Sequence, residues 1–147
     1  MEFETQAQGE CYDRVLPWVT ELFGGSVLRK ADMPVLGVMH GSAFAQIGVF
    51  PWSEDDAIIT TRAYVVTGAD LTPELMRFLL LENAGMRFGA FGIDDDGDII
   101  FEHSIVGSTC DQKELESSVI HVARTADEYD DRIVARWGGE RALDQIR

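Results

Sequence analysis

Basic residues are scarce in this sequence. Its 147 residues include 12 lysines and arginines against 26 aspartates and glutamates, which gives a formal net charge of −14 at pH 7. A field of this sign repels phosphate backbones and anionic membranes, so we expect neither a nucleic acid nor a membrane as partner. A basic patch interleaved with aromatic residues is also missing. The excess of acidic residues keeps the protein soluble and also favours basic partners. Solubility alone and the recruitment of a basic partner are both open interpretations of it.

Long hydrophobic runs are absent as well, since no segment approaches the ~20 apolar residues of a membrane-spanning helix. Residues 1–6 carry acids where a signal peptide carries basic residues. The cysteines, Cys11 and Cys110, match no metal-binding spacing, and we expect free thiols in a reducing compartment. With 46% hydrophobic and 26% charged residues, residues 1–147 are expected to form one globular, cytoplasmic domain.

The first segment with a helical period runs from about Glu10 to Phe23. Gly24 and Gly25 can end it, because glycine accepts the left-handed backbone conformation. Pro17 predicts a kink or a later start, because proline removes a backbone hydrogen bond inside a helix. The apolar positions that carry the period are Cys11, Tyr12, Val15, Leu16, Val19, Leu22 and Phe23.

Helical periodicity disappears between Pro34 and Thr67. Short runs that are rich in β-branched or apolar residues take its place at 35–39, 44–50 and 57–66. Polar turns separate these runs. The pattern predicts three strands in an antiparallel meander.

A second helix is indicated by Thr72, Pro73 and Glu74. Threonine can cap the first free N–H groups, proline tolerates the first helical position, and glutamate suits the positive end of the helix dipole. The body of this helix, 75–81, is apolar on most sides, unlike an exposed helix. It is therefore either buried in the domain or packed against another subunit. The predicted dimer interface consists of Leu75, Phe78, Leu79, Leu81 and Phe88.

Two further strand-like runs, 86–93 and 98–106, flank a turn that ends in Asp96-Gly97, and Asp-Gly between strands predicts a hairpin. A long amphipathic helix then begins near Asp111, with Glu114 in the capping-box position, and ends at Gly138. The expected fold class is α+β in the order helix-strand-strand-strand-helix-strand-strand-helix. Its antiparallel sheet is packed by the helices.

No group of residues predicts a catalytic, cofactor or metal site. The acidic turn fails the EF-hand calcium pattern, because glycine and the final glutamate are out of place when the loop is counted from Asp94. His103 alternates with apolar residues, so we expect a hydrogen-bonded core histidine rather than a metal ligand. The glycine-rich stretch 87–92 lies in a strand and not at the strand-to-helix turn that would bind phosphate.

Cys110 is the one residue with a possible catalytic interpretation. It precedes the last helix, whose dipole can lower the pKa of a thiol, but the neighbouring Asp111 opposes that effect. A thiol enzyme that uses Cys110, with His103 or His121 as partner, is therefore a minor hypothesis.

Several motifs occur at 72–75, 80–83, 87–91, 96–99, 102–108 and 126–131. With the element order and the acidic balance, they resemble the YbjN-like family of bacterial proteins, especially its cyanobacterial-type members, and the fold of type III secretion chaperones. The resemblance covers roughly residues 34–139 and is close from Leu71 onward. It implies a domain, commonly a homodimer, that binds protein segments on a hydrophobic surface, and it implies no enzyme activity.

We therefore expect a non-catalytic, chaperone-like module that binds protein or peptide clients as a homodimer. The alternative is a regulatory or sensory domain that binds a small ligand or one signalling protein. Exposed tryptophans often anchor partners, which favours Trp18 and Trp52. A core position is the simpler interpretation for most of the other candidates. The predicted client-binding surface consists of Val15, Trp18, Val19, Phe23, Phe44, Ile47, Phe50 and Trp52.

Overall fold

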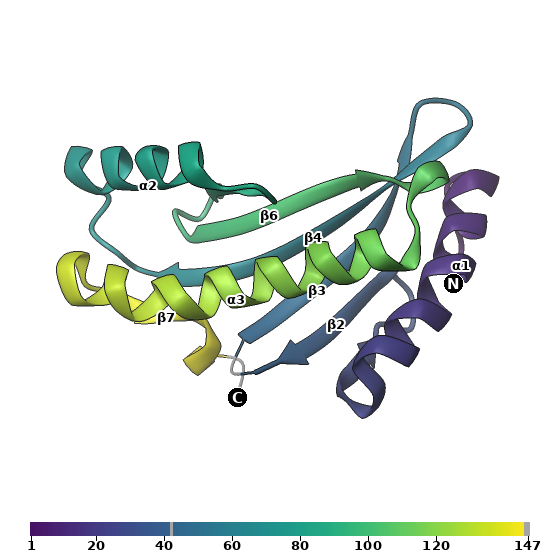
Figure 1. Ribbon diagram of the computed structural model, residues 1–147, viewed down its shortest axis with the longest axis horizontal. Coiled ribbons are helices and arrows are strands. Elements are labelled where there is room, and N and C mark those ends of the chain that lie inside the picture. The colour runs from purple at the N-terminus through teal and green to yellow at the C-terminus, as the bar shows by residue number, and fades with distance from the viewer. Residues whose placement is uncertain (42, 146–147) are drawn as a thin grey trace.

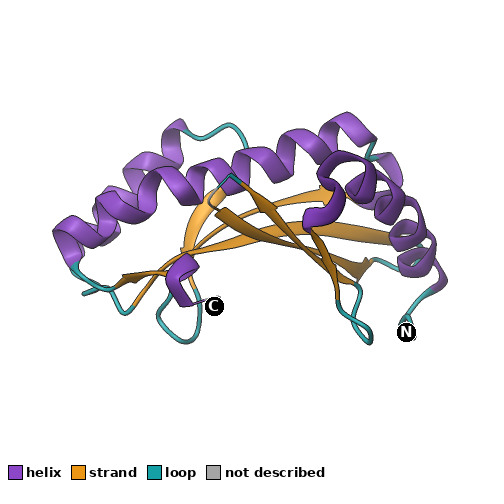
Figure 2. Ribbon diagram, turned by 90° about the horizontal axis from the view of Figure 1, so that it is seen from below, coloured by secondary structure: helices purple, strands orange, loops and turns teal. Residues whose placement is uncertain are grey.

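The sheet and the α-helices form two stacked layers in the computed structural model (Figure 1), which describes residues 1–41 and 43–145. The α-helices lie together on one side of the sheet (Figure 2). They are α1 (Gln6–Phe23), α2 (Pro73–Gly85) and α3 (Gln112–Trp137). Among the described residues, no helix has both the length and the apolar character that crossing a membrane requires.

The strands are β1 (Val27–Arg29), β2 (Val35–His40), β3 (Ala43–Trp52), β4 (Asp56–Thr67), β5 (Ala90–Ile93), β6 (Ile99–Val106) and β7 (Glu140–Arg141). Their order in the antiparallel sheet is β1-β2-β3-β4-β6-β5, so β4 is central. β7 pairs with the end of β4, where Arg141 lies opposite Val66. Short 3₁₀ helices follow α1, β6 and β7, namely η1 (Gly24–Ser26), η2 (Gly107–Thr109) and η3 (Ala142–Gln145).

The predicted α+β class and the order of the main elements are confirmed. β1 and β7 were not predicted, because strands of 3 and 2 residues are too short to show a period of two. The hairpin of β5 and β6 is confirmed too, with Ile93 opposite Ile99.

α1 begins at Gln6 rather than near Glu10 and continues through Pro17, so the later start that the proline suggested is wrong. Thr5 caps the helix, since its Oγ1 accepts a hydrogen bond from the backbone N–H of Gln8 at 3.1 Å. The buried Gln8 amide then donates to the carbonyl oxygen of Val49 in β3 at 2.9 Å. This polar first turn is held by hydrogen bonds, which an apolar period does not reveal.

α3 crosses the sheet and contributes to both halves of the core. Leu115 and Val119, near its start, pack with α1 and with β2, β3 and β4. Val122 and Ile133, further along, pack with α2, β5 and β6. All four side chains are fully buried, and each contributes about 1.5–3 kcal/mol relative to an exposed position.

Side chains of the central strand alternate between the two faces of the sheet. Ala57, Ile59 and Ala63 point toward the helices and are buried, whereas Thr60 and Arg62 point the other way. No α-helix in the described part of the chain covers that second face (Figure 2). We call it the open face. Its side chains come from β3, β4 and β6 and include Phe44, Gln46, Phe50, Thr60, Arg62, Tyr64, Glu102 and Ser104.

Replacing Leu115 by alanine is expected to lower the free energy of unfolding by about 2–5 kcal/mol, because it leaves a cavity under α3. Leu28→Ala is the matched control, since Leu28 is 61% exposed, and it should change the free energy by less than about 0.5 kcal/mol. Urea unfolding of both variants measures the difference. Equal losses would show that α3 is not packed on the sheet as described.

Candidate functional site

Two phenylalanines of the open face lie directly on glycines. The Phe44 ring crosses onto Gly37 of β2, where an added Cβ atom would lie 2.7 Å from Phe44 Cζ. The Phe50 ring lies on Gly48 of its own strand, where a Cβ atom would lie 2.6 Å from Phe50 Cζ. Both contacts are closer than a side chain permits, so the glycines let the rings rest against the backbone. The result is an apolar surface on a solvent-facing sheet.

A groove runs along this face. One part, of about 190 Å³, is lined by Val35, Gln46, Gly48, Phe50, Thr60, Arg62 and Tyr64. A second part, of about 220 Å³, shares Gln46, Arg62 and Tyr64 with the first and extends to Phe44 and to η3. Because the two parts share three lining residues, they adjoin each other and together form a depression across β3 and β4. We call it the open-face groove.

Polar side chains beside the groove are paired across the strands. Arg62 Nη2 lies 2.7 Å from Glu102 Oε2, and the Thr60 and Ser104 hydroxyls are 2.8 Å apart. Both pairs are between residues directly opposite each other in β4 and β6. Because these polar groups bond one another, a client segment that covers them leaves fewer unpaired donors and acceptors than it would over unpaired side chains.

The predicted client-binding residues do not form one surface. Three of them, Val15, Val19 and Ile47, are fully buried in the core between α1 and β3. Their assignment to a surface is therefore wrong. They share a helix or strand face, as the periodicity indicates, but that face is covered. Phe50 and Trp52 are 43% and 49% exposed at the end of β3.

The remaining predicted residues divide between the two layers. Phe44 is half-buried and lies on the open face. Trp18 and Phe23 are half-buried on α1 and pack against the edge of the core. The Arg14 guanidinium lies 5.8 Å from the Trp18 ring, and the Phe23 ring lies 6.3 Å from that of His40.

The predicted dimer interface is also divided. Leu75 and Leu79 are 0% and 4% exposed because they pack into the core, so they are not available to a second subunit as predicted. Phe78 is half-buried against Trp137, with ring centroids 5.2 Å apart. Leu81 is 60% exposed. The outer side of α2 carries a shallow apolar groove lined by Leu71, Pro73, Met76, Arg77, Leu80 and Leu81.

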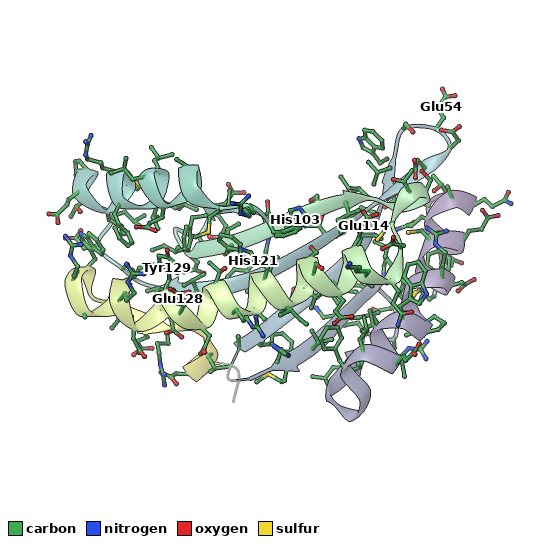
Figure 3. The ribbon with its side chains drawn as sticks, viewed as in Figure 1. Glu54, His103, Glu114, His121, Glu128 and Tyr129 are labelled. Atoms are coloured by element: carbon green, nitrogen blue, oxygen red, sulfur yellow. The ribbon has the colours of Figure 1, made fainter. Side chains whose placement is uncertain are left out.

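Phe88, the last predicted interface residue, is 37% exposed and lies between two histidines. Its ring centroid is 5.6 Å from that of His103 and 5.5 Å from that of His121. Figure 3 shows both histidines between β6 and α3. His103 Nδ1 lies 2.7 Å from the Ser118 hydroxyl, which confirms a hydrogen-bonded histidine on the packed side of its strand. Burial lowers the pKa of both imidazoles, which favours their neutral forms.

Cys110 has none of the properties of an activated nucleophile. It is 6% exposed, and burial raises the pKa of its thiol to about 11. Its Sγ donates to the carbonyl oxygen of Asp111 at 3.3 Å, and His103 is bonded to Ser118 instead. These observations contradict the thiol-enzyme hypothesis.

The acidic turn is built as a hairpin connection. Asp94 Oδ1 accepts hydrogen bonds from the backbone N–H groups of Asp96 at 3.1 Å and Asp98 at 2.9 Å, and Gly97 takes the positive φ of +82° that the turn needs. The carboxylates of Asp94, Asp96 and Asp98 lie within 4.8 Å of one another. Burial and its two acidic neighbours raise the pKa of Asp98.

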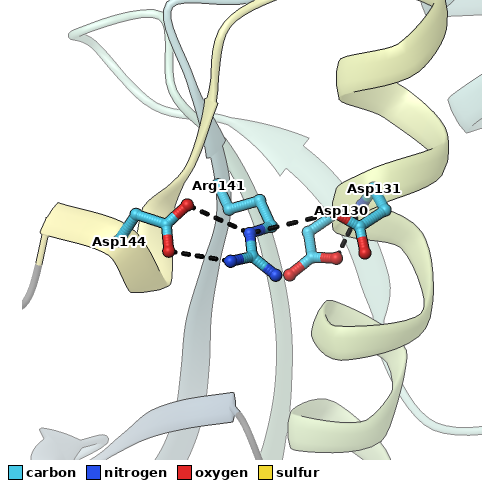
Figure 4. Close-up of polar contacts among 4 residues, drawn as sticks. All are labelled: Asp130, Asp131, Arg141 and Asp144. Atoms are coloured by element: carbon cyan, nitrogen blue, oxygen red, sulfur yellow. Dashed lines mark hydrogen bonds and ion pairs between the residues drawn. The ribbon is translucent and has the colours of Figure 1, made fainter.

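Asp130 is the residue that the sequence analysis missed. It lies on α3 beside Asp131, Arg141 and Asp144 (Figure 4), and it is 5% exposed. Burial raises the pKa of its carboxyl to about 6. Its position, four residues after Ala126 on the apolar stripe, was a signal that could have identified it.

A family model matches residues 10–145 and is described as "T3SS (YopN, CesT) and YbjN peptide-binding chaperone 1". The chain belongs to this family. The resemblance to YbjN-like proteins and to type III secretion chaperones is thereby confirmed, and with it a family of peptide-binding rather than enzymatic type. A search of curated proteins finds no match.

Solved structures share the fold at low sequence identity. A chain of the ExsC–ExsE complex has a TM-score of 0.64 at 13% identity, covering 88% of this chain and 97% of its own. A chain of the Yersinia pestis type III secretion chaperone SycH in complex with a fragment of YscM2 has a TM-score of 0.54 at 15% identity, covering 80% and 98%. YbjN from E. coli has a TM-score of 0.52 at 16% identity, covering 80% and 92%.

In the folded protein, Cys110 is expected to react with iodoacetamide at pH 7.5 at least about 100-fold more slowly than in urea, because a pKa of about 11 leaves little thiolate. Mass spectrometry of timed samples measures the rate. A Thr109→Cys variant supplies an exposed thiol one residue away as the reference. Equal rates for Cys110 and this reference would restore the nucleophile hypothesis.

Proposed function

We propose that this protein is a non-catalytic, chaperone-like module that binds an extended segment of a client protein on its open face. The observation that carries the proposal is the groove on an uncovered sheet face, which ends beside the exposed Phe50 and Trp52. Membership in a family of peptide-binding chaperones supports it. The comparison structures contain complexes, including that of SycH with a fragment of YscM2.

The shape of the groove favours an extended chain over a compact small-molecule ligand. Its two adjoining parts measure about 190 and 220 Å³ and follow one another along β3 and β4. Each part suits one side chain. An extended segment presents side chains at regular intervals, so successive residues can occupy successive parts.

We further propose that the protein is a homodimer whose interface includes the outer side of α2. Leu80 and Leu81 are 70% and 60% exposed there, beside Leu71 and Met76. Adjacent exposed leucines on one helix are unusual on a monomer surface, because burying them is worth about 1.5–3 kcal/mol each. Of the five residues of the predicted interface, this surface keeps Leu81 and leaves out the buried Leu75 and Leu79.

A double variant, Phe50→Ala with Trp52→Ala, is expected to weaken client binding at least tenfold, because exposed aromatic side chains are the usual anchors of interfaces. The client is first isolated by affinity purification from the source cell. Calorimetry with the isolated client segment then gives the affinity. Thermal unfolding should change little, since both side chains are exposed.

The control is Ile93→Ala, which removes an apolar side chain that is 36% exposed in β5. It should leave client affinity unchanged. Hydrogen exchange of the complex is expected to show protection in β3 and β4 and a client that is extended. A stoichiometric folded partner whose affinity is unaffected by the double variant would favour the regulatory alternative.

Leu80→Glu with Leu81→Glu is expected to convert the dimer to a monomer, because the substitutions place like charges at an apolar contact. Light scattering measures the mass, which should fall from twice 16.3 kDa to 16.3 kDa. Ala84→Glu, an exposed position on the same helix outside the groove, is the control and should remain dimeric. A wild-type protein that is monomeric at micromolar concentration would contradict the proposed dimer.

A further inference from the structure

The larger part of the open-face groove lies where β3 and β4 diverge. Their pairing extends from Trp52 opposite Asp56 to Gln46 opposite Arg62. Further along, β4 pairs with β7 instead, while the first residues of β3 pair with β2. The cavity of about 220 Å³ lies at this divergence, and residues of α3 line it together with residues of the strands. The gap in the sheet therefore gives the open face access to α3.

A buried carboxylate lies at the α3 side of this cavity. Asp130 lines the cavity, is 5% exposed, and accepts a hydrogen bond through Oδ1 from the backbone N–H of Asp131 at 2.6 Å. Among the described residues, Asp130 forms no salt bridge. The nearby Arg141 pairs with Asp144 at 2.9 Å and with Asp131 at 3.8 Å (Figure 4), and its charge offsets only part of the effect of burial, which raises the pKa of Asp130. A buried carboxylate without its own ion pair is costly, and a cation in the cavity would reduce that cost.

The other residues that line the cavity also favour a positively charged occupant. Asp98 and Asp127 also line the cavity, whereas its basic residue, Arg62, is paired with Glu102. Phe44 and Tyr64 are the aromatic residues of its lining. Carboxylates together with aromatic rings bind ammonium and guanidinium groups, through charge-assisted hydrogen bonds and cation–π contacts. The net charge of −14 on the whole chain attracts such groups over a longer range.

We propose that this cavity binds the side chain of a lysine or arginine in the client segment that lies along the open face. The cavity adjoins the other part of the groove at Gln46, Arg62 and Tyr64, which line both, so one extended segment can reach both parts. The identity of the occupant as a client side chain rests on the proposed function. The positive charge of the occupant is inferred from the residues of the cavity alone.

The charge specificity can be tested without a client. We expect N-acetyl-lysine methylamide to produce saturable NMR shifts at Phe44, Tyr64 and residues 126–130 at pH 7.5. The uncharged analogue N-acetyl-norleucine methylamide, which has a similar shape, should bind at least tenfold more weakly. Asp130→Asn should weaken lysine-probe binding at least tenfold. Asp95→Asn removes one charge from the exposed acidic turn and should leave that binding unchanged.

Asp130→Asn is expected to fold, because asparagine replaces a carboxylate whose ionised form is disfavoured by burial, and thermal unfolding checks this. Tyr64→Leu, at a 37% exposed position, provides a second variant that keeps all charges and should also weaken the lysine probe. Equal binding of the two probes, or full binding by Asp130→Asn, would overturn the inference.

The same variants distinguish this inference from the proposed function. Consider a client whose binding depends on Phe50 and Trp52. Its lysines and arginines are replaced one at a time by norleucine. At one position the replacement should lower the affinity for the wild-type protein at least tenfold and change the affinity for Asp130→Asn little. If no position behaves in this way, the inference is wrong and the proposed function stands. If the lysine probe binds but no client segment does, the proposed function fails and a free amine is the occupant.

Discussion

The burial of the α3 stripe against the middle of the sheet is the interaction on which both halves of this protein depend. Leu115 and Val119 belong to the part of the core beneath α1, whereas Val122 and Ile133 belong to the part beneath α2. α1 and α2 are far apart in the sequence and lie at different ends of α3 (Figure 1). α3 therefore links the two parts of the core, together with the central strand β4, which contributes Ile59 to one part and Ala63 to the other.

Because every α-helix in the described part of the chain lies on one side of the sheet, the side chains of the opposite face are in contact with solvent. Antiparallel sheets tolerate such exposure when the outer face is polar. Here the face is mixed, because Arg62 and Thr60 pair with opposite residues on β6 while Phe44 and Phe50 rest on glycines. An outer face that is neither fully polar nor covered is consistent with a binding surface.

Local signals in the sequence predicted the element order well. The cap positions are confirmed, since Thr72 Oγ1 accepts from the N–H of Leu75 at 3.1 Å and Asp111 Oδ1 accepts from that of Glu114 at 2.7 Å. These contacts span only three residues, so they can be identified from neighbouring residue types.

What the sequence could not show is which face each element presents to the core. Periodicity indicates that residues share a face, but the covering element is set by distant parts of the chain. For this reason Ile47 was assigned to a surface and is buried, while Leu75 was assigned to an interface and packs into the core. The divergence of β3 and β4, and the cavity that it opens, depend on pairing between Val66 and Arg141, which no local pattern encodes.

That pairing has a consequence for the order of folding. Contacts between residues distant in sequence form late, because closing a long loop costs entropy before the contact is gained. The hairpins of β2, β3 and β4 can form while the ribosome is still adding later residues, but β7 and η3 cannot join them until residues 140–145 have been made. The hairpins beside Phe50 can therefore pair before α3 is made, but the open face becomes stable only when α3 packs on the sheet, and the cavity at Asp130 is completed last.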